Sequence, residues 1–516
     1  MRIDYVYIED FKNLKKFEID LDENFMETVL LGQNATGKSN FIESLILIFK
    51  HLDLSTQNEF DYKIYYRVRS QNIRIDFTEG KYAIKVDDNS ISISEFSRRK
   101  SELLPKYVFT YYSGSSNRLK EHFDQHQKRF YDKIIKPTFD ETEIDNLRRL
   151  FYVQLVHSYF VLLAYFSFEV HEKDSIQFLR DVLGIEDLES ILFILHKPIW
   201  KGKGDPRFWG ASGLVQEFLE RVWDLSIAPI YHKDRISLNF RKFTTQDRLY
   251  LYISSKNKLK ELSGFYRSNT DFFKALESTY ISDIIEEIKV KVKKRDIDGE
   301  IGFKELSEGE QQLLTVMGLL KFTKDEESLI LLDEPDTHLN PLWKWKYLEY
   351  LKSVIPDKDS TQIILNTHDP LVIGSLRKEQ VRMFSESRGI VSTKQPDVDP
   401  KGLGVAGILT SELFMMPTTL DTETQKILDE RNLLLAKQQH EELSQTEKFR
   451  LNEIFSNLRD LGITQTYRDP IYQKFLAAIS GREEFKTKAQ YSAEDLNKQN
   501  EIAISILDEL VKEEKE

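Results

Sequence analysis

The sequence predicts an α/β protein with a mixed-sheet domain, here called the head, an inserted helical lobe and a C-terminal helical domain. Three stretches carry this prediction. Apolar residues 27–31 lead into a glycine-rich loop and a helix, the apolar run 328–332 ends in two carboxylates, and the apolar run 362–365 ends in polar residues. Short apolar runs that end in polar loops are typical of buried strands whose loops meet at one edge of a sheet.

The length and composition indicate a multidomain protein without a membrane span. The chain has 516 residues, which suggests about three domains as a first estimate. Its apolar runs, such as 159–166 and 188–195, are far shorter than the roughly 20 residues that a membrane-spanning helix needs. The chain has no cysteine, and its first residues lack the pattern of a signal peptide. We therefore expect a cytoplasmic protein with no disulfide, no thiolate metal site and no membrane partner.

The charge pattern limits contact with nucleic acid to local surfaces. The formal net charge of -12 makes the surface repel nucleic acid on average. Residues 98–136 are an exception, because ten Lys and Arg residues stand there against four Asp and Glu residues, with aromatic residues between them. This stretch is a candidate nucleic-acid surface. The alternative is a solvated helix face, which is the commoner role of such a run.

The first fifty residues predict three strands, a phosphate-binding loop and a helix. Strands are expected at Asp4–Ile8, Lys16–Ile19 and Glu27–Leu31, and a helix at Asn40–Phe49. Between them, residues 32–39 match the pattern GxxxxGK[ST], and the preceding strand and following helix are the context that this pattern requires. Its backbone N–H groups wrap phosphate oxygens, its lysine reaches the terminal phosphates, and its serine ligates magnesium. The candidate nucleotide-binding residues here are Gly32, Asn34, Gly37, Lys38, Ser39 and Asn40.

The middle of the chain predicts a hairpin, a buried strand and a helical insertion. Period-2 runs at Asn72–Phe77 and Lys81–Val86 predict the hairpin, and Tyr107–Tyr112 predicts a strand that ends in a polar glycine loop. The apolar positions between Leu150 and Leu163 predict a buried helix. Further helices are expected at Asp187–Leu195 and Leu214–Val222, on either side of a loop rich in Gly, Pro and Trp. These segments predict a compact helical lobe inserted at 139–235.

A Leu-Ser-x-Gly segment follows the insertion. Strands are expected at Ile236–Phe240 and Leu249–Ile253, and a hairpin at 288–303 that turns at Asp298-Gly299. The hairpin leads into Leu306–Leu314, which opens an apolar-periodic helix with a serine, a glycine and unpaired backbone N–H groups at its positive end. Such an end binds phosphate. Taken alone, the segment is better explained by a serine N-cap before an ordinary helix.

Two later strands end in candidate catalytic groups. Asp333 and Glu334 follow the apolar run 328–332, where Asp333 suits magnesium contact and Glu334 suits a general base toward an attacking water. His368 follows the next apolar run, where a hydrogen-bond donor to a terminal phosphate is wanted. Beyond Pro370 the chain is expected to be loop-rich and then helical from Glu423 to its end. The expected domains are 1–138 (first part of the head), 139–235 (helical lobe), 236–395 (second part of the head) and 396–516 (a helical domain that docks a partner).

In this order, the phosphate loop, the LSEGEQQ segment, the LILLDE strand, the segment 336–341 and His368 resemble the motif set of ABC-class ATPases, specifically the SMC, RecF and OLD-like branch. The segment 8–14 resembles the start of that branch, in which a basic residue at the place of Lys12 approaches the nucleotide. Asp333 and Glu334 stand in the Walker B position of the set. The family's Q-loop glutamine has no clear counterpart here, since Gln125 and Gln127 lie in a different local pattern.

The resemblance implies a homodimer or higher homo-oligomer that encloses ATP and Mg²⁺ between subunits. Each nucleotide would lie between residues 32–39 of one copy and Ser307 to Gly309 of another, so that Ser307 and Gly309 contact the γ-phosphate in trans. By the same resemblance, Glu334 polarises the attacking water, His368 contacts the γ-phosphate, and Asp336 links the two sites. The catalytic candidates are therefore Lys38, Ser307, Glu334 and His368, and the magnesium candidates are Ser39 and Asp333.

Other segments are similar to ATPase subunits of Septu and retron-associated anti-phage systems, a similarity that extends beyond the head. They are Tyr111–Gly114, Phe208–Gly213, Leu461-Gly462 and Asp469–Tyr472. This similarity implies a regulatory or sensor ATPase that controls a separate HNH nuclease and, in retrons, assembles with a reverse transcriptase and its RNA–DNA product. One alternative is a RecF- or SMC-like repair ATPase that clamps DNA with residues 98–136. Another is an OLD-type nuclease, for which Asp397-Val398-Asp399 supplies one element only.

Overall fold

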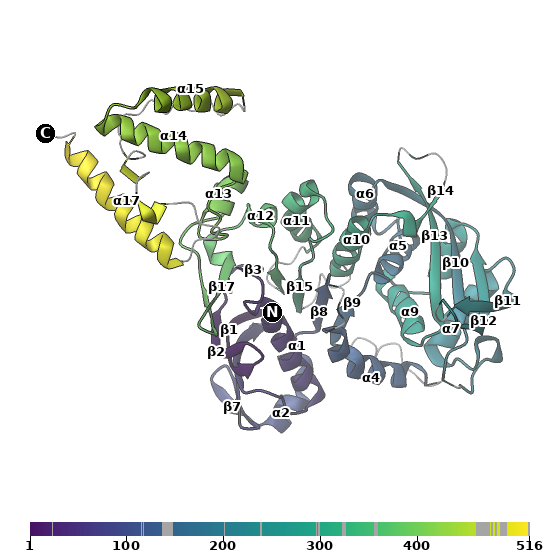
Figure 1. Ribbon diagram of the computed structural model, residues 1–516. Helices are drawn as coiled ribbons and strands as arrows, with labels where there is room; N and C mark the ends of the chain where they lie inside the picture. The colour runs from purple at the N-terminus through teal and green to yellow at the C-terminus, as the bar shows by residue number, and fades with distance from the viewer. Residues whose placement is uncertain are drawn as a thin grey trace. The chain divides into compact units, whose positions relative to one another are not determined.

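The computed structural model describes residues 1–22, 24–114, 116, 118–136, 148–200, 202–237, 240–295, 297, 300–321, 327–355, 360–460, 475, 478–479, 482–485 and 493–513. The chain forms two compact units, residues 1–395 and residues 396–516, each described here by itself. Figure 1 labels their helices and strands.

The first unit contains a seven-stranded sheet that carries the expected head strands. Its order is β18-β17-β3-β16-β15-β8-β9, and all neighbours are parallel except β17 and β18. The strands are β3 (Glu27–Gly32), β8 (Tyr107–Tyr112), β9 (Leu150–Val153), β15 (Ser328–Asp333), β16 (Thr361–Asn366), β17 (Val381–Ser387) and β18 (Ile390–Lys394). Because β3, β16, β15 and β8 run parallel, the loops that follow them leave the same edge of the sheet. The predicted strands at 27–31, 107–112, 328–332 and 362–365 are confirmed.

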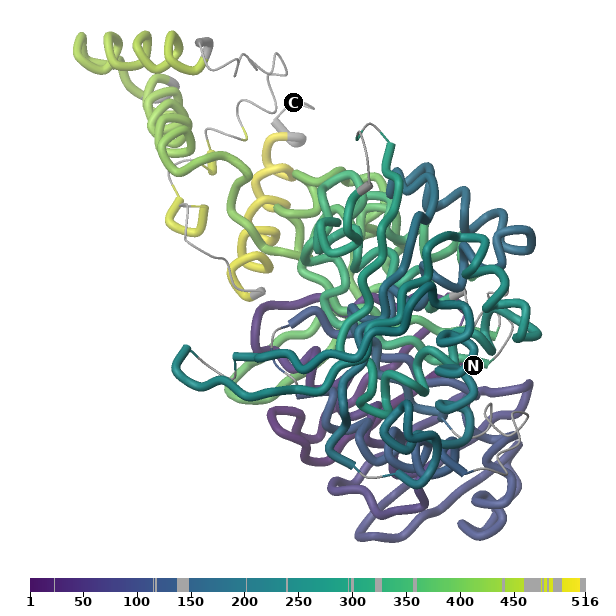
Figure 2. Tube along the Cα trace, turned by 90° about the vertical axis from the view of Figure 1, so that its right-hand side faces the viewer, coloured from purple at the N-terminus to yellow at the C-terminus, as the bar shows by residue number. Residues whose placement is uncertain are grey.

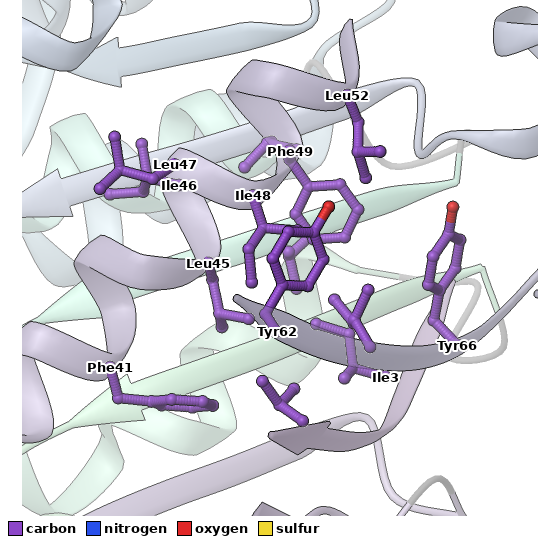
Figure 3. Packing of buried hydrophobic residues seen from close by; sticks show 14 of the residues in the cluster. Ile3, Phe41, Leu45, Ile46, Leu47, Ile48, Phe49, Leu52, Tyr62 and Tyr66 are labelled. Atoms are coloured by element: carbon purple, nitrogen blue, oxygen red, sulfur yellow. The ribbon is translucent and has the colours of Figure 1, made fainter. Parts of the chain in front are cut away.

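An antiparallel sheet packs against the helix that follows the phosphate loop. The sheet has the order β2-β1-β4-β5-β6-β7. Its strands are β1 (Arg2–Phe11), β2 (Leu14–Asp20), β4 (Tyr62–Val68), β5 (Gln71–Thr78), β6 (Lys81–Val86) and β7 (Asn89–Ile91). Helix α1 (Lys38–Leu54) is apolar around most of its circumference and is buried along its length. Figure 3 shows Phe41, Leu45 and Phe49 of this helix among Tyr62 and Tyr66 of β4, in one continuous core. This packing fixes the helix whose first residues are Lys38 and Ser39.

The third sheet, also in the first unit, is antiparallel and has the order β11-β12-β10-β13-β14. Its strands are β10 (Ile185–His196), β11 (Ile230–Ser237), β12 (Phe243–Ile253), β13 (Ile285–Lys294) and β14 (Glu300–Gly302). Figure 2 shows the β11–β12 hairpin, in teal, reaching past its neighbours. The other helices of the first unit are α2 (Ile93–Arg98), α3 (Lys100–Leu103), α4 (Asp124–Ile134), α5 (His157–Ser167), α6 (Lys173–Val182), α7 (Gly213–Leu225), α8 (Lys256–Ser263), α9 (Asn269–Ile281), α10 (Glu308–Lys321), α11 (Pro341–Val354) and α12 (Pro370–Ile373). Short 3-10 helices are η1 (Lys120–Phe123), η3 (Pro206–Phe208), η4 (Phe303–Glu305) and η5 (Lys378–Gln380).

Two helix predictions in the insertion are wrong. Residues 187–195 belong to strand β10, which pairs along its length with the lysine-rich strand β13. Residues 150–153 form strand β9, and the expected buried helix starts only at His157. A short apolar run fits a buried strand and a buried helix equally well, so its secondary structure depends on whether a neighbouring strand pairs with it. Residues 139–235 therefore hold strands as well as helices, and β10 and β11 share one sheet with strands that follow residue 235.

The second unit is helical in its described residues, as expected. It contains α13 (Gly404–Thr410), α14 (Thr422–His440), α15 (Gln445–Asp460), η6 (Glu483–Phe485) and α17 (Ala493–Glu513). An ion pair between Arg450 and Glu430, at 2.8 Å, joins α15 to α14. The segments Leu461-Gly462 and Asp469–Tyr472 lie outside the described residues, as does the turn at Asp298-Gly299. Within the described part of the chain, every helix is too short or too polar to cross a membrane.

Candidate nucleotide site

The loop between β3 and α1 has the conformation of a phosphate cradle. Gly32 has a φ of 146° and Gly37 a φ of 97°, which side chains with a Cβ rarely adopt. A Cβ at Gly32 would overlap the carbonyl oxygen of Phe384, and one at Gly37 would lie 2.8 Å from Leu14 Cδ2. Asn34 lies exposed on the loop, and Thr36 Oγ1 donates to the Gln33 carbonyl at 2.8 Å. The two glycines therefore let the chain turn tightly into the helix and bring backbone N–H groups to one place.

Lys38 is folded back over the loop. Its Nζ donates to the carbonyl oxygens of Gly32 and Gln33, at 2.8 Å each, and the residue is 4% exposed. Burial lowers the pKa of Lys38 to about 8, against the raising effect of the Asp333 and Glu334 carboxylates. A buried ammonium held only by neutral carbonyls gains from an anionic partner within reach.

Ser39 meets the end of strand β15 at the expected magnesium position. Its Oγ donates to Asp333 Oδ1 at 3.1 Å, and Asn366 Nδ2 donates to the same oxygen at 2.5 Å. Asp333 is fully buried, and its Oδ2 has no hydrogen-bond partner among the residues that the structure describes. Burial raises the pKa of Asp333, although the hydrogen bonds from Asn366 and Ser39 oppose this. A buried carboxylate with one unsatisfied oxygen beside a serine hydroxyl suits a divalent cation.

Glu334 and His368 stand at the mouth of the same site. Glu334 N donates to the Asn366 carbonyl at 2.9 Å, and the residue has a φ of 53°, which turns its side chain out of the strand. Glu334 Oε1 lies 3.5 Å from His368 Nε2, and the side chains are 40% and 37% exposed. Burial and the charge of Lys38 lower the pKa of His368, so the imidazole is neutral at neutral pH. The five residues predicted at three strand ends are thus brought together at one edge of the sheet.

The Lys12 side chain reaches α1 and not the loop itself. Its Nζ lies 2.6 Å from both carboxylate oxygens of Glu43, which is 3% exposed. Arg118 and His122 also contact this carboxylate, at 3.3 Å and 3.0 Å. Burial alone would raise the pKa of Glu43, but the hydrogen bonds from His122 and Lys12 and the nearby charges leave it lowered. Glu43 therefore anchors the side chains of Lys12, Arg118 and His122.

Asn40 connects this cluster to the phosphate loop. Arg118 Nη2 donates to Asn40 Oδ1 at 3.2 Å, Asn40 Nδ2 donates to Asn13 Oδ1 at 2.7 Å, and Asn13 Nδ2 donates to the Ala35 carbonyl at 2.9 Å. Glu43, Asn13 and Asn366 were not among the site residues predicted from the sequence, and Arg118 was counted only as part of a basic stretch. A glutamate inside an apolar helix was the available signal for Glu43, because such a side chain needs a cationic partner. Gln125 and Gln127, the nearest candidates for a Q-loop glutamine, lie on α4.

Ser307 caps helix α10 within its own chain. Glu310 N donates to Ser307 Oγ at 3.2 Å and Ser307 N donates to Glu310 Oε2 at 2.8 Å, which is a capping box; the Ser307 hydroxyl also donates to Glu310 Oε2 at 2.9 Å. Ser307 is nevertheless exposed. Gly309 is buried, and a Cβ there would overlap the carbonyl oxygen of His338. Gly309 therefore lies beside His338, and no hydrogen bond or ion pair among the described residues joins Ser307 or Gly309 to the phosphate loop.

Asp336, which follows the Walker B strand, is used inside the chain. It is 4% exposed and accepts a hydrogen bond from Thr367 Oγ1 at 2.9 Å. Burial raises the pKa of Asp336 to about 6, with Thr367 and Lys344 opposing this and Asp369 adding to it. Thr337 Oγ1 lies 3.1 Å from Ser113 Oγ in the loop after β8. These bonds tie the loops after β8, β15 and β16 to one another.

The residues present fit a nucleotide with one magnesium ion. The loop N–H groups and Lys38 would hold the phosphates, and Ser39 with Asp333 would hold the ion. Among the described residues there is no group of three or more His, Cys, Asp or Glu that could hold a metal by itself. A magnesium ion held by Ser39 and Asp333 would take its further ligands from phosphate oxygens and water. Bound in this way, the nucleotide supplies the phosphoanhydride bond and the ion neutralises charge on its oxygens.

Comparisons with known proteins agree with this arrangement. A family model described as "AAA ATPase domain" matches residues 1–183, and one described as "AAA domain, putative AbiEii toxin, Type IV TA system" matches residues 210–374. The chain is 27% identical over 261 residues to Septu protein PtuA of Bacillus mycoides, a match that covers 48% of this chain and 35% of that protein. It is 22% identical over 452 residues to the Retron Vc95 probable ATPase of Vibrio cholerae, covering 79% of this chain and 78% of that protein.

The matched region spans about a third of the PtuA relative and about four fifths of the retron relative. Among solved structures, the SMC head domain from Thermotoga maritima aligns with a TM-score of 0.34 and 11% identity, over 77% of this chain and all of that one. The motif order, the parallel sheet and the two family matches all indicate a P-loop ATPase domain. The chain is similar to the ATPases of Septu and retron systems.

Proposed function

We propose that this protein binds and hydrolyses ATP with Mg²⁺ and uses the reaction to regulate a defence complex. The observation that supports this best is the convergence of Lys38, Ser39, Asp333, Glu334 and His368 at the carboxyl ends of β3, β15 and β16. A cradle, a cation site and an outward carboxylate are the three parts that phosphoryl transfer to water requires.

Each side chain has one role in the proposed reaction. Glu334 accepts a proton from the attacking water, whose oxygen bonds to the terminal phosphorus while the bond to the leaving ADP breaks. Lys38 leaves its carbonyl partners to balance charge on the phosphates. His368, neutral at this position, donates a hydrogen bond to a γ-phosphate oxygen. The basic residue Lys12 stays on Glu43 and orders the turn beside the loop.

The proposal includes composite sites between two or more copies of the chain. Ser307 is exposed at the positive end of α10, yet its contacts within the chain lie with Glu310 and not with residues 32–39. A second copy could bring this helix end to the terminal phosphate, where its N–H groups and hydroxyl would bind. ATP would then also hold the copies together.

The proposed biological role is regulation of a separate nuclease in anti-phage defence. It rests on the similarity to a Septu protein and a retron ATPase. The partner in this proposal is an HNH nuclease, joined in a retron setting by a reverse transcriptase with its RNA–DNA product. Residues 396–516, which are helical in their described part, are the proposed docking domain.

Replacing Glu334 by Gln tests the reaction and the role together. We expect hydrolysis to fall at least a hundredfold while ATP binding is kept, because the cradle and cation site are intact. Glu349→Gln on exposed α11 is the matched control and should hydrolyse ATP as wild type does. The readouts are phosphate release, ATP binding, and protection from phage when the protein is expressed with its neighbouring genes.

The combined outcomes distinguish ATP whose hydrolysis drives the function from ATP that is only a structural ligand. Loss of hydrolysis together with loss of protection supports an ATP-driven regulator. Protection that survives without hydrolysis would make ATP a structural ligand, and purification from these cells without a co-purifying nuclease would contradict the regulatory role.

A further inference from the structure

The β11–β12 hairpin extends beyond the sheet to which it belongs. Residues 248–253 of β12 pair with β10 on one side and, up to Tyr250, with β11 on the other. At the outer end, Phe243, Thr244 and Thr245 pair with Ser237, Ile236 and Arg235 of β11. In the described part of the chain, this outer ladder has no third strand, and Figure 2 shows it reaching past its neighbours. The outer end is thus a two-stranded ribbon, here defined as residues 235–237 and 240–245.

The ribbon is basic in a protein that is acidic overall. Residues 235–245 include Arg235, Arg241 and Lys242 and no Asp or Glu, whereas the whole chain has 85 acidic against 73 basic residues. All three cations are exposed. Their charge is therefore not cancelled by acids on the ribbon itself.

The acidic residues of the hairpin are engaged at its inner end. Asp234 accepts from Arg248 Nη1 at 3.1 Å and also from the Tyr250 hydroxyl. Arg248 in turn donates from Nε to Glu286 of β13 at 2.6 Å. These pairs neutralise the root of the hairpin, so the positive charge is concentrated toward its outer end.

Two large aromatic side chains are exposed among the cations. Phe240 is 84% exposed and Phe243 is 52% exposed. The Arg241 guanidinium lies 4.8 Å from the Phe240 ring centre, and that of Arg235 lies 4.4 Å from the Phe243 ring centre. Each exposed ring therefore contacts the guanidinium of an exposed arginine. Nucleic-acid surfaces combine basic and aromatic side chains in this way to bind phosphates and bases.

We propose that this ribbon binds duplex DNA. A two-stranded β-ribbon fits the major groove of B-form DNA, which is about 12 Å wide, whereas the narrow major groove of an RNA helix does not admit it. Arg235, Arg241 and Lys242 bind backbone phosphates, and the two phenylalanines contact sugars and base edges. The surface is separate from the nucleotide site and requires no hydrolysis, so the proposal stands independently of the proposed function.

Helix α4 is the rival basic surface, and it supplies the matched control. Lys128 and Arg129 on the helix and Lys136 just after its end are exposed, but Asp124 and Asp132 share the helix, and no exposed large aromatic accompanies them. Among the described residues, the ribbon therefore has no acidic side chain and has two exposed aromatic rings, whereas α4 carries two Asp residues and has no exposed large aromatic.

The test compares two charge-reversal variants of the full chain. One is Arg235→Glu/Arg241→Glu/Lys242→Glu, and the other is Lys128→Glu/Arg129→Glu/Lys136→Glu, so both change the charge equally. Binding to a labelled 30-base-pair DNA duplex is measured by fluorescence anisotropy from 50 to 200 mM salt. We expect the ribbon variant to bind at least tenfold more weakly at 50 mM salt, and its slope of log K against log salt to become shallower by about 2 to 3. The α4 variant should bind within twofold of wild type.

A second variant and an RNA duplex sharpen the result. Phe240→Ala/Phe243→Ala keeps the charge, so we expect weaker binding with an unchanged salt slope. Double-stranded RNA of the same length should bind at least tenfold more weakly than DNA. Unchanged ATP hydrolysis and thermal unfolding of the ribbon variants would show that the fold is intact, since these residues are exposed. Equal binding by wild type and ribbon variant, loss of binding in the α4 variant alone, or capture of an acidic protein without duplex binding would each overturn the proposal.

Discussion

At the scale of single residues, Lys38 is the group whose charge controls the nucleotide site. Its ammonium is buried, is held by two carbonyl oxygens of the loop, and has a pKa lowered to about 8. Near pH 7 it is cationic and available to phosphate. Above pH 8 the free protein loses this proton, while a bound polyphosphate would restore it.

We therefore predict that ATP affinity falls as the pH rises through about 8. Binding requires the protonated form of Lys38, so above that pH the dissociation constant should increase by a factor approaching ten per pH unit. Titration with a fluorescent ATP analogue from pH 6.5 to 9.5 measures this. Lys38→Met is the control and should bind weakly at every pH. A wild-type affinity that stays constant over this range would contradict the lowered pKa of Lys38.

Asp336 carries a charge that costs stability at neutral pH. Its carboxyl is buried, and its pKa of about 6 lies above the ordinary value of an aspartate, about 3.9. Between these pH values the native state binds more protons than the unfolded chain, so the free energy of unfolding falls as the pH rises. Above pH 6 the cost stays constant.

Asp336→Asn should therefore stabilise the protein at pH 7.5, by about 1 to 3 kcal/mol. Asparagine can still accept from Thr367 Oγ1 but has no charge to bury. The gain, measured as the shift in the midpoint of thermal unfolding, should be about half as large at pH 5. Asp369→Asn, at a half-buried position paired with Lys344, is the comparison. A gain at Asp336 that does not depend on pH would show that charge burial is not its cause.

The candidate site could be predicted from sequence where a motif and a strand end coincide. Lys38, Ser39, Asp333, Glu334 and His368 were placed together because parallel strands deliver their loops to one edge. The cluster around Glu43 could not be predicted, because its members are brought together by α1, a hairpin turn and the loop after β8. No periodic pattern links positions whose contact depends on how a helix sits on a sheet.

At the scale of elements, helices α5 and α10 pack closer than side chains normally allow. Val161 of α5 is fully buried, and a Cβ at Gly318 of α10 would overlap it. Tyr165 of α5 also donates its hydroxyl proton to the Gly318 carbonyl at 3.2 Å. Because Ser307 and Gly309 lie at the start of α10, the contact between α5 and α10 also helps to position the Leu-Ser-x-Gly segment.

We expect Gly318→Ala to destabilise the protein by about 1 to 3 kcal/mol, because the stiff β-branched Val161 cannot move aside. Thermal unfolding measures the loss. Val161→Ala alone should also destabilise, by leaving space, whereas the double variant should recover most of the stability lost in either single variant. Additive losses in the double variant would contradict a direct contact at this pair.

The elements that were predicted correctly from the sequence have strong local signals, whereas the wrongly predicted elements have weak local signals. The alternation at 288–293 and the turn residues at 78–81 identified β13 and the β5–β6 hairpin. The apolar run at 187–195, which was predicted to be a helix, has no clear period. Only pairing with β13, including the ion pair between Lys293 and Glu189 at 2.8 Å, makes this run a strand.

At the scale of the whole molecule, the proposed composite site depends on a second copy of the chain to supply Ser307 to a given phosphate loop. In one chain, Ser307 contacts Glu310, and Gly309 packs against His338. The Leu-Ser-x-Gly segment is therefore in contact with the residues after β15 and not, among the described residues, bonded to the phosphate loop. If each site combines residues 32–39 of one copy with Ser307 of another, defects in the two places should complement each other.

Two heterodimers distinguish the arrangements. In the first, one copy carries Lys38→Met and the other carries Ser307→Arg, and differently tagged copies are purified in tandem. If the sites are composite, one site has both parts intact, and we expect about half of wild-type hydrolysis. If each copy holds its own complete site, both sites are defective and hydrolysis should be absent.

The second heterodimer joins a wild-type copy to a copy with both changes, so the same two substitutions are present in the same number. Composite sites would now each contain one defective part, because the intact loop faces Ser307→Arg and the intact serine faces Lys38→Met. Hydrolysis should then be lost, whereas sites complete within one copy would keep about half of it. The two heterodimers must therefore give opposite results, and a nonspecific effect of either substitution on folding or association cannot produce that reversal.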